Sequence, residues 1–278
     1  MALRVLLPAE FQEQHQRITL EYLQRGHDLN RQEWSQAIAA FDLLNDALVL
    51  SSAGLLPFPV IYRQHVEDRY ADAFIERLYT ARQVDRESVV IWAGIARQIA
   101  VDLAQAGLYQ SDVSGTRLLL SYCLYWWRAF TLGYAFEVEI QRDLAQSGIK
   151  FTAHDLRRRE NRLTPYDIAV LGFKGDIKTS VYFLQASRSR SLAHDFYITR
   201  VYGRERVRTL VVFMQATMWQ AIDGDTLLVL LEEIADTLPH AARIRHQGIE
   251  LTVIDYETWK QKIRRRQAAG PTKKESEW

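Results

Sequence analysis

Residues 165–180 read PYDIAVLGFKGDIKTS, and this stretch decides the fold of the second half of the chain. Two runs, Tyr166–Leu171 and Asp176–Leu184, are typical of short strands because β-branched and aromatic residues are frequent in them. The four residues between these runs begin and end with glycine, which favours a chain reversal. The sequence therefore predicts a hairpin whose turn is centred near residues 173 and 174.

The hairpin is flanked by sequence that predicts helices and further strands. A long apolar helix is expected before it, from about Arg117 to Gln146, ending at Ser147-Gly148. A helix followed by several strands is the pattern of an α/β domain, so we expect a mixed sheet flanked by helices. The elements expected after the hairpin are strands near Phe196–Tyr202 and Thr209–Met218, a helix near Asp225–Leu238, a strand at Ile249–Asp255 and a short helix at Glu257–Arg266.

The first part of the chain has a different character, because residues 9–112 repeat apolar side chains at the spacing of helices. Ser51–Pro59 contains a glycine and two prolines, and is predicted to be a connection. We therefore expect a helical N-terminal domain (1–112), an α/β domain (113–266) and a flexible tail (267–278). The expected helices of the first domain are Glu10–Arg25, Arg31–Leu48, Val66–Arg82 and Glu87–Ala106.

The composition is that of a soluble globular protein, with 48% hydrophobic and 25% charged residues. The single cysteine, Cys123, excludes an intramolecular disulfide framework and fits a cytoplasmic location. The N-terminus has too short an apolar run for a signal peptide. The apolar stretch Leu118–Phe136 carries Arg128 near its middle, where lipid makes a charge costly, so we expect a buried helix and no membrane partner.

The charge is spread unevenly although the net charge is only +1. Residues 1–149 contain 13 arginines, no lysine and 18 acidic residues, whereas residues 150–210 contain 13 basic residues and six acidic ones. A local positive field favours a polyanionic partner such as nucleic acid. The alternative is an arginine-rich surface that is simply solvated.

The chemistry centres on Asp176 and Lys178. Residues i and i+2 of a strand point to the same face, so the two side chains project together while Ile177 turns toward the core. A carboxylate can bind a divalent cation, and an ammonium group beside it can hold an attacking water. The alternative is a surface hairpin on which both side chains are solvated.

A second acid, Asp167, lies nine residues before Asp176 at the start of the preceding strand. A turn centred at residues 173 and 174 would place Asp167 opposite Thr179 and Ser180, beyond Asp176. A bend or bulge near Pro165 would then be needed to bring the two carboxylates together.

A third acid, Glu137, falls on the stripe of the long helix that also carries Ile140 and Leu144. This phase turns its carboxylate inward, whereas Glu139 is expected to meet solvent. Carboxylate oxygens suit Mg²⁺ or Mn²⁺, and the lack of sulfur or paired imidazole ligands nearby argues against zinc.

At these residues the chain resembles the PD-(D/E)xK nuclease superfamily, which has the restriction-endonuclease-like fold. Two departures from the family pattern are that Tyr166 separates the Pro and the Asp of its motif, and that the second acid is Asp where Glu is commoner. The resemblance covers roughly Gly133 to Asp255 and rests on Glu137, on the helix-to-strand junction Leu144…Ser147-Gly148-Ile149, on Pro165-Tyr166-Asp167 and on Asp176-Ile177-Lys178-Thr179-Ser180.

The resemblance implies that Asp167 and Asp176 bind Mg²⁺ or Mn²⁺ together with the backbone carbonyl of Ile177. It implies that Lys178 orients the attacking water and stabilises the developing charge, and that Glu137 positions a second metal ion or a water. The implied activity is that of a metal-dependent endonuclease acting on nucleic acid, DNA being expected, in restriction, defence, repair or mobile-element processing.

Other interpretations remain open. The chain could be a catalytically inactive protein of the nuclease fold that binds nucleic acid or assists assembly, and the helical N-terminal region could support a homodimer or bind a protein partner. His194-Asp195 could assist near the site, although an isolated histidine in a loop more often has no special role. The arginines that could contact phosphates are Arg157, Arg158, Arg159, Arg162, Arg188 and Arg190.

Overall fold

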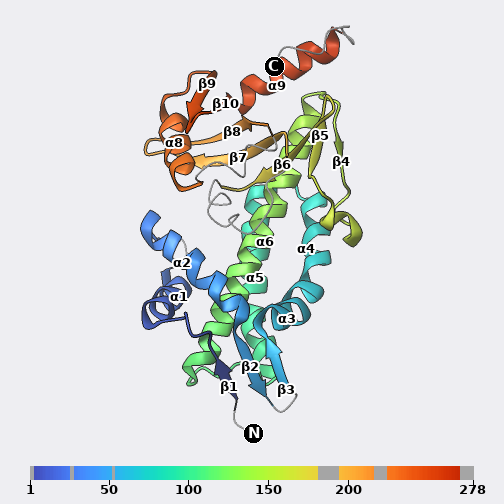
Figure 1. The fold of residues 1–278 in the computed structure, drawn as a ribbon. Coiled ribbons are helices and arrows are strands. Elements are labelled where there is room, and N and C mark those ends of the chain that lie inside the picture. Colours follow the sequence, from blue (N-terminus) through green and yellow to red (C-terminus); the bar gives the residue numbers. More distant parts are fainter. Residues whose placement is uncertain (1–2, 26–27, 52–53, 181–193, 216–223, 270–278) are drawn as a thin grey trace. The chain divides into compact units, whose positions relative to one another are not determined.

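The computed structural model describes residues 3–25, 28–51, 54–180, 194–215 and 224–269 (Figure 1). Contacts divide the chain into two compact units, Met1–Tyr134 (unit 1) and Ala135–Trp278 (unit 2). The division falls inside the longest helix, α6 (Ser114–Gln146), whereas the sequence analysis places the domain boundary between residues 112 and 113, ahead of this helix.

Unit 1 is mainly helical, as its apolar spacing predicts. A short 3₁₀ turn (Leu44–Asp46) follows α2, and a π-helical turn (Arg63–Glu67) joins α3 to α4. Its helices are α1 (Glu13–Arg25), α2 (Arg31–Leu43), α3 (Phe58–Tyr62), α4 (Asp68–Thr80), α5 (Val84–Gln105) and the first part of α6.

Unit 1 also contains a small antiparallel sheet that the sequence analysis missed. Its strands are β1 (Arg4–Leu6), β2 (Leu48–Ser51) and β3 (Gly54–Pro57), in that order. The prediction of a plain connection at Ser51–Pro59 was wrong, and so was that of a helix reaching Leu48. Two strands of four residues each are too short for a period of two to stand out from neighbouring helical sequence.

The aromatic seam of α6 lies in the core of unit 1. Tyr122, Cys123 and Trp127 are buried, and Phe41 stacks on Tyr125 with ring centroids 4.0 Å apart. Burial raises the pKa of the Cys123 thiol, which suits an inert core residue. No helix in the described part of the chain combines the length and apolarity that crossing a membrane requires.

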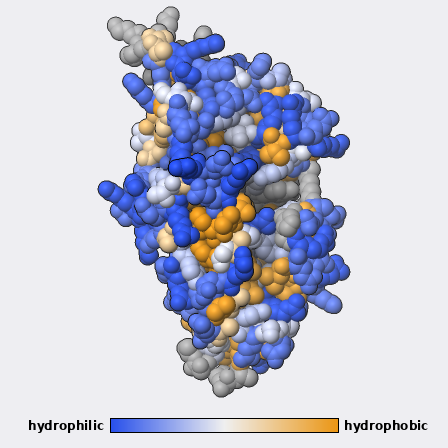
Figure 2. Space-filling view, turned by 180° about the vertical axis from the view of Figure 1, so that it is seen from behind, coloured by the Kyte–Doolittle hydropathy of each residue, from blue (hydrophilic) through white to orange (hydrophobic). Residues whose placement is uncertain are grey.

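The surface of unit 1 exposes several large apolar side chains, among them Val89, Val90 and Val101 of α5. Figure 2 shows a face on which hydrophobic residues interrupt a largely hydrophilic surface. A homodimer or protein partner bound through unit 1 stays a prediction.

Unit 2 is built on a seven-stranded mixed sheet, so the predicted α/β class is confirmed. Among the described strands, β6 and β7 pair in parallel and all other neighbours pair antiparallel. The sequence analysis missed β9, an edge strand whose side chains alternate between exposed and half-buried. The order across the sheet is β4 (Thr152–Ala153), β5 (Ile168–Val170), β6 (Phe173–Lys178), β7 (Phe196–Tyr202), β8 (Val207–Phe213), β10 (Ile249–Asp255) and β9 (Ala241–His246).

Helices cover both faces of this sheet. One face packs through Ile177, Phe196 and Ile198 against the C-terminal part of α6 and against α9 (Tyr256–Ala268). The other face packs through Tyr197 and Val201 against α8 (Gly224–Thr237). Because α9 runs to Ala268, the start of the predicted tail at residue 267 was wrong; residues 270–278 lie outside the described residues.

The β5–β6 hairpin is shorter than the sequence predicts. Its turn is made by Leu171 (φ 53°) and Gly172 (φ 88°), and Val170 pairs with Phe173. The prediction of a turn centred at residues 173 and 174 was therefore wrong by two residues. Gly175 instead lies within β6, where a glycine is required because a Cβ would lie 2.2 Å from the ring of Phe196.

Candidate active site

The shorter hairpin changes the position of Asp167. Continuing the register from Ile168 and Gly175 by one residue places Asp167 opposite Asp176. The Asp167 amide donates to the carbonyl of Gly175 at 3.1 Å, and its Oδ2 accepts from the Ile177 amide at 2.8 Å. The expected position opposite Thr179 and Ser180 was wrong, and no bulge is needed to bring the acids together.

Asp167 and Asp176 form a carboxyl pair. Their side chains are hydrogen bonded to each other, and Asp176 Oδ1 also accepts from the Ile177 amide at 3.0 Å. Burial, and then the neighbouring Asp176, raises the pKa of Asp167 well above its usual value. Burial acts in the same direction on Asp176, but the hydrogen bond from Asp167 and the Lys178 charge outweigh it and lower the pKa. The two carboxyl groups therefore titrate as a pair in which the charge is favoured on Asp176 over Asp167.

Lys178 completes the pair as its counter-ion. Its Nζ lies 2.6 Å from Asp176 Oδ2, and its side chain is 36% exposed. Ile177, between them, turns its side chain into the core beneath α6 and α9. The side chains of Asp176 and Lys178 thus lie together on one face, as strand periodicity predicts.

Glu137 of α6 is the third acid, and it is 6% exposed. Its Oε1 accepts a hydrogen bond from Gln141 Nε2 at 3.0 Å. Burial, and then the charge of Asp176, raises the pKa of Glu137 to about 8, although Lys178 opposes this shift. Glu139 points elsewhere and pairs with Arg200 at 3.1 Å, so helical phase does distinguish the two glutamates.

His194 lies against the same group. Its Nε2 is 2.6 Å from the carbonyl of Pro165, and because a carbonyl only accepts, this nitrogen carries the hydrogen. Its Nδ1 is 3.1 Å from the Tyr197 hydroxyl and 3.9 Å from Asp176 Oδ2. His194 therefore ties the segment that carries Asp167 to the start of β7.

Two neighbours of the site in β7 were missed by the sequence analysis. In the parallel register Tyr197 lies beside Asp176, and Thr199 lies beside Lys178. The hydroxyl of Thr199 is buried and has no hydrogen-bond partner among the described residues. The parallel pairing of β6 with β7 would have revealed both residues, but nothing in the sequence fixes that register.

The donor set suits a hard divalent cation in its chemistry. Three buried or half-buried carboxyl groups lie near Lys178, and burial together with the neighbouring acids raises the pKa of Glu137 and of Asp167. The arrangement is not closed around one point: among the described residues, no group of three or more acidic, histidine or cysteine side chains is placed to hold an ion. The Lys178 ammonium is already paired with Asp176 Oδ2, an oxygen that could otherwise bind a cation.

Four of the six arginines expected to contact phosphates lie in the segment before β5. Arg157, Arg158 and Arg159 are exposed, and Arg157 pairs with Asp155 at 2.8 Å. Arg162 is half-buried and donates from Nε to the carbonyl of Leu156 at 2.7 Å. Arg188 and Arg190 lie outside the described residues. Phosphate binding by this set stays a prediction.

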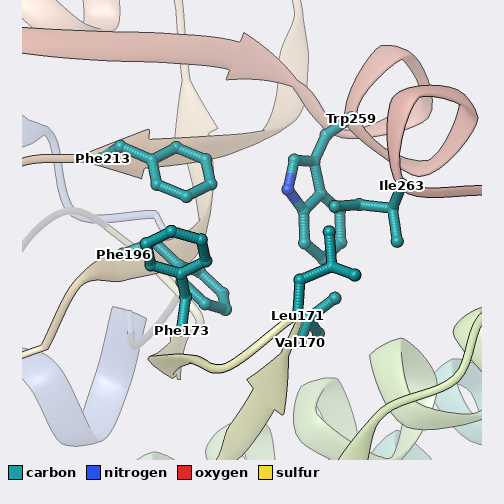
Figure 3. A pocket seen from close by; sticks show the side chains of 7 residues that line it. All are labelled: Val170, Leu171, Phe173, Phe196, Phe213, Trp259 and Ile263. Carbon is teal, nitrogen blue, oxygen red and sulfur yellow. The ribbon is translucent and has the colours of Figure 1, made fainter. Parts of the chain in front are cut away.

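An apolar pocket lies in unit 2 apart from these acids (Figure 3). The pocket shares Val170, Phe196 and Trp259 with the core on the α6 and α9 face of the sheet. Asp176 and Lys178 project from the other face of β6, so the pocket is not part of the acidic site. Its lining is Val170, Leu171, Phe173, Phe196, Phe213, Trp259 and Ile263, none of which can bind a phosphate by charge.

Comparison of the chain with models of protein families, with curated proteins and with solved structures gives no match. Any functional interpretation therefore depends on the arrangement of the residues themselves.

Proposed function

We propose that the chain is a metal-dependent nuclease that hydrolyses phosphodiester bonds in nucleic acid, DNA being the expected substrate. The proposal includes a restriction-endonuclease-like fold for unit 2. The observation that carries it is the meeting of Asp167, Asp176 and Lys178 on adjacent strands, with the buried Glu137 carboxyl in electrostatic range. Acids with perturbed pKa values beside a lysine are typical of a reaction site.

Asp167 and Asp176 would hold Mg²⁺ or Mn²⁺, with the Ile177 carbonyl as a further ligand. A bound divalent cation polarises the phosphodiester and stabilises the negative charge that develops on its oxygens. It would also replace the proton that Asp167 and Asp176 share, because two neighbouring carboxylates ionise together only beside additional positive charge.

Lys178 would leave Asp176 and donate hydrogen bonds to the attacking water and to a non-bridging phosphate oxygen. Its ammonium is placed for this because it already lies within 2.6 Å of the carboxylate at the centre of the site. Once ionised, the Glu137 carboxylate would accept a proton from the water, and its raised pKa makes it a stronger base than an ordinary glutamate.

The test is cleavage of DNA and RNA substrates by the full chain in the presence of Mg²⁺ or Mn²⁺. Asp176→Asn and Lys178→Met should each lower the cleavage rate by a factor on the order of a thousand. Glu139→Gln is the matched control, because it removes an acid from the same helix as Glu137 but outside the site, and it should cleave normally. Cleavage that survives both site changes would contradict the proposal.

The second candidate function is nucleic-acid binding without cleavage. The observation that favours it is the direct contact of Lys178 with Asp176, which leaves no ready group of ligands for an ion among the described residues. Tight binding of nucleic acid together with no metal-dependent cleavage of any substrate would establish this alternative.

A further inference from the structure

Lys174 shares a strand face with the proposed site. In β6, the side chains of Lys174, Asp176 and Lys178 alternate with those of the core and project to the same side. Two residues of a strand span about 6.6 Å. That step is close to the distance between neighbouring phosphates along one nucleic-acid strand.

The position of Lys174 is fixed by its surroundings. Its amide donates to Asp195 Oδ2 at 2.8 Å, and its carbonyl accepts from the Asp195 amide at 2.9 Å. Its ammonium lies over the ring of Tyr166, 5.1 Å from the centroid, and that ring packs against His154 at 5.1 Å. The side chain is therefore held on one aromatic face.

In the described part of the chain, the Lys174 ammonium contacts an aromatic ring but pairs with no carboxylate. The residue is exposed, and among the described residues its Nζ forms no ion pair. Lys178, by contrast, is bound to Asp176. A fixed ammonium group without a carboxylate partner is suited to an anion from outside.

We propose that Lys174, held by Tyr166, binds the phosphate next to the one that is cleaved, so that the substrate strand runs along β6. This inference rests on the proposed function, because the position of the cleaved phosphate is taken from Asp176 and Lys178. The ligand is the phosphate backbone itself, which carries one negative charge for each nucleotide.

The first test measures binding of a fluorescent oligonucleotide by the full chain without divalent ions, over a series of salt concentrations. Lys174→Ala should reduce the slope of log K against log salt by about 0.7 to 0.9, the value for one lost phosphate contact. The matched control is Lys150→Ala, an exposed lysine of unit 2 that is not on β6. An unchanged slope for Lys174→Ala, or an equal loss in the control, would overturn the inference.

The second test locates the phosphate, using substrates with one uncharged methylphosphonate linkage beside the cleaved bond. When the uncharged linkage lies on one particular side of the cleaved bond, the wild-type protein should cleave about tenfold more slowly. The Lys174→Ala variant should show a similar loss of cleavage rate on the ordinary substrate. When Lys174→Ala acts on the substrate with the uncharged linkage, the two losses of cleavage rate should not add. Additive losses would contradict the inference.

The two tests also separate this inference from the proposed function. If no substrate is cleaved but the salt slope still depends on Lys174, the nuclease proposal fails and the phosphate contact stands. If cleavage depends on Asp176 and Lys178 but Lys174→Ala leaves the salt slope unchanged, the nuclease proposal stands and the phosphate contact of Lys174 is refuted.

Discussion

Both units bury acidic side chains, but they surround them differently. In unit 1, Asp102 is 5% exposed and lies 2.8 Å from Arg69 Nη1. It also accepts hydrogen bonds from the Tyr70 hydroxyl and from Gln98 Nε2. Burial acts to raise the pKa of Asp102, but these donors outweigh it and lower the pKa. The buried charge of unit 1 is therefore fully matched by its neighbours.

In unit 2, Lys178 supplies the one ammonium group that lies near Glu137, Asp167 and Asp176 among the described residues, and two of these acids have raised pKa values. Removing a matched acid such as Asp102 is expected to destabilise the fold, because its partners then lose the group to which they are bonded. An unmatched group of acids costs stability, and such a cost is typical of a place kept for a ligand. The comparison therefore separates a structural acid from the three acids that we propose to be functional.

The largest effect on stability is expected at Asp102. Asp102→Asn should lower the free energy of unfolding by about 3 kcal/mol, since it removes the buried charge to which Tyr70 and Gln98 donate hydrogen bonds. Asp167→Asn should leave stability unchanged or raise it, because burial and the neighbouring Asp176 already disfavour a charge on Asp167. Chemical denaturation of both variants at pH 7 measures the difference. Equal losses in the two variants would show that the acids of the two units are not different in kind.

A smaller effect, with a definite pH dependence, is expected at Glu137. Its folded-state pKa of about 8 exceeds the unfolded value, so folding takes up a proton and stability falls as the pH rises between about 5 and 8. Glu137→Gln has no such proton, and its stability relative to the wild type should grow by on the order of 2 kcal/mol from pH 5.5 to pH 8. Denaturant titrations at the two pH values test this prediction. If the stability difference between the variant and the wild type does not change with pH, the raised pKa of Glu137 is refuted.

The smallest effect is expected from removing the shared counter-ion. Lys178→Met should lower the free energy of unfolding by about 1 kcal/mol at pH 8, a value kept small because the lysine is partly exposed. At pH 5 the loss should shrink, because Glu137 and Asp167 are then protonated. Thermal unfolding at both pH values measures it. A loss that is larger at pH 5 than at pH 8 would contradict the assignment of Lys178 as the counter-ion.

Local periodicity was sufficient to predict much of the site. A period of two in the strand placed Asp176 with Lys178, and a period of 3.6 in the helix turned Glu137 inward in preference to Glu139. Both predictions depend only on the element that carries the residue. The α/β class and the helical first part of the chain followed from the same local patterns.

The position of Asp167 could not be derived in this way, because it depends on the turn. Leu171 adopts a positive φ that costs energy for a residue with a Cβ, so the glycines at 172 and 175 were the better turn candidates. Gly175 is instead required by the ring of Phe196, a residue that follows it by 21 positions. His194 and Tyr197 joined the site through the parallel pairing of β6 with β7, which is equally non-local.

The most direct test of the unmatched acids in unit 2 is a calorimetric titration of the full chain with Mn²⁺, without nucleic acid. The wild-type protein and the control Glu139→Gln should bind Mn²⁺ alike and release protons as they do so, because Asp167 must ionise. Asp176→Asn should bind at least about tenfold more weakly. No Mn²⁺ binding by the wild-type protein, or equal binding by Asp176→Asn, would contradict the account.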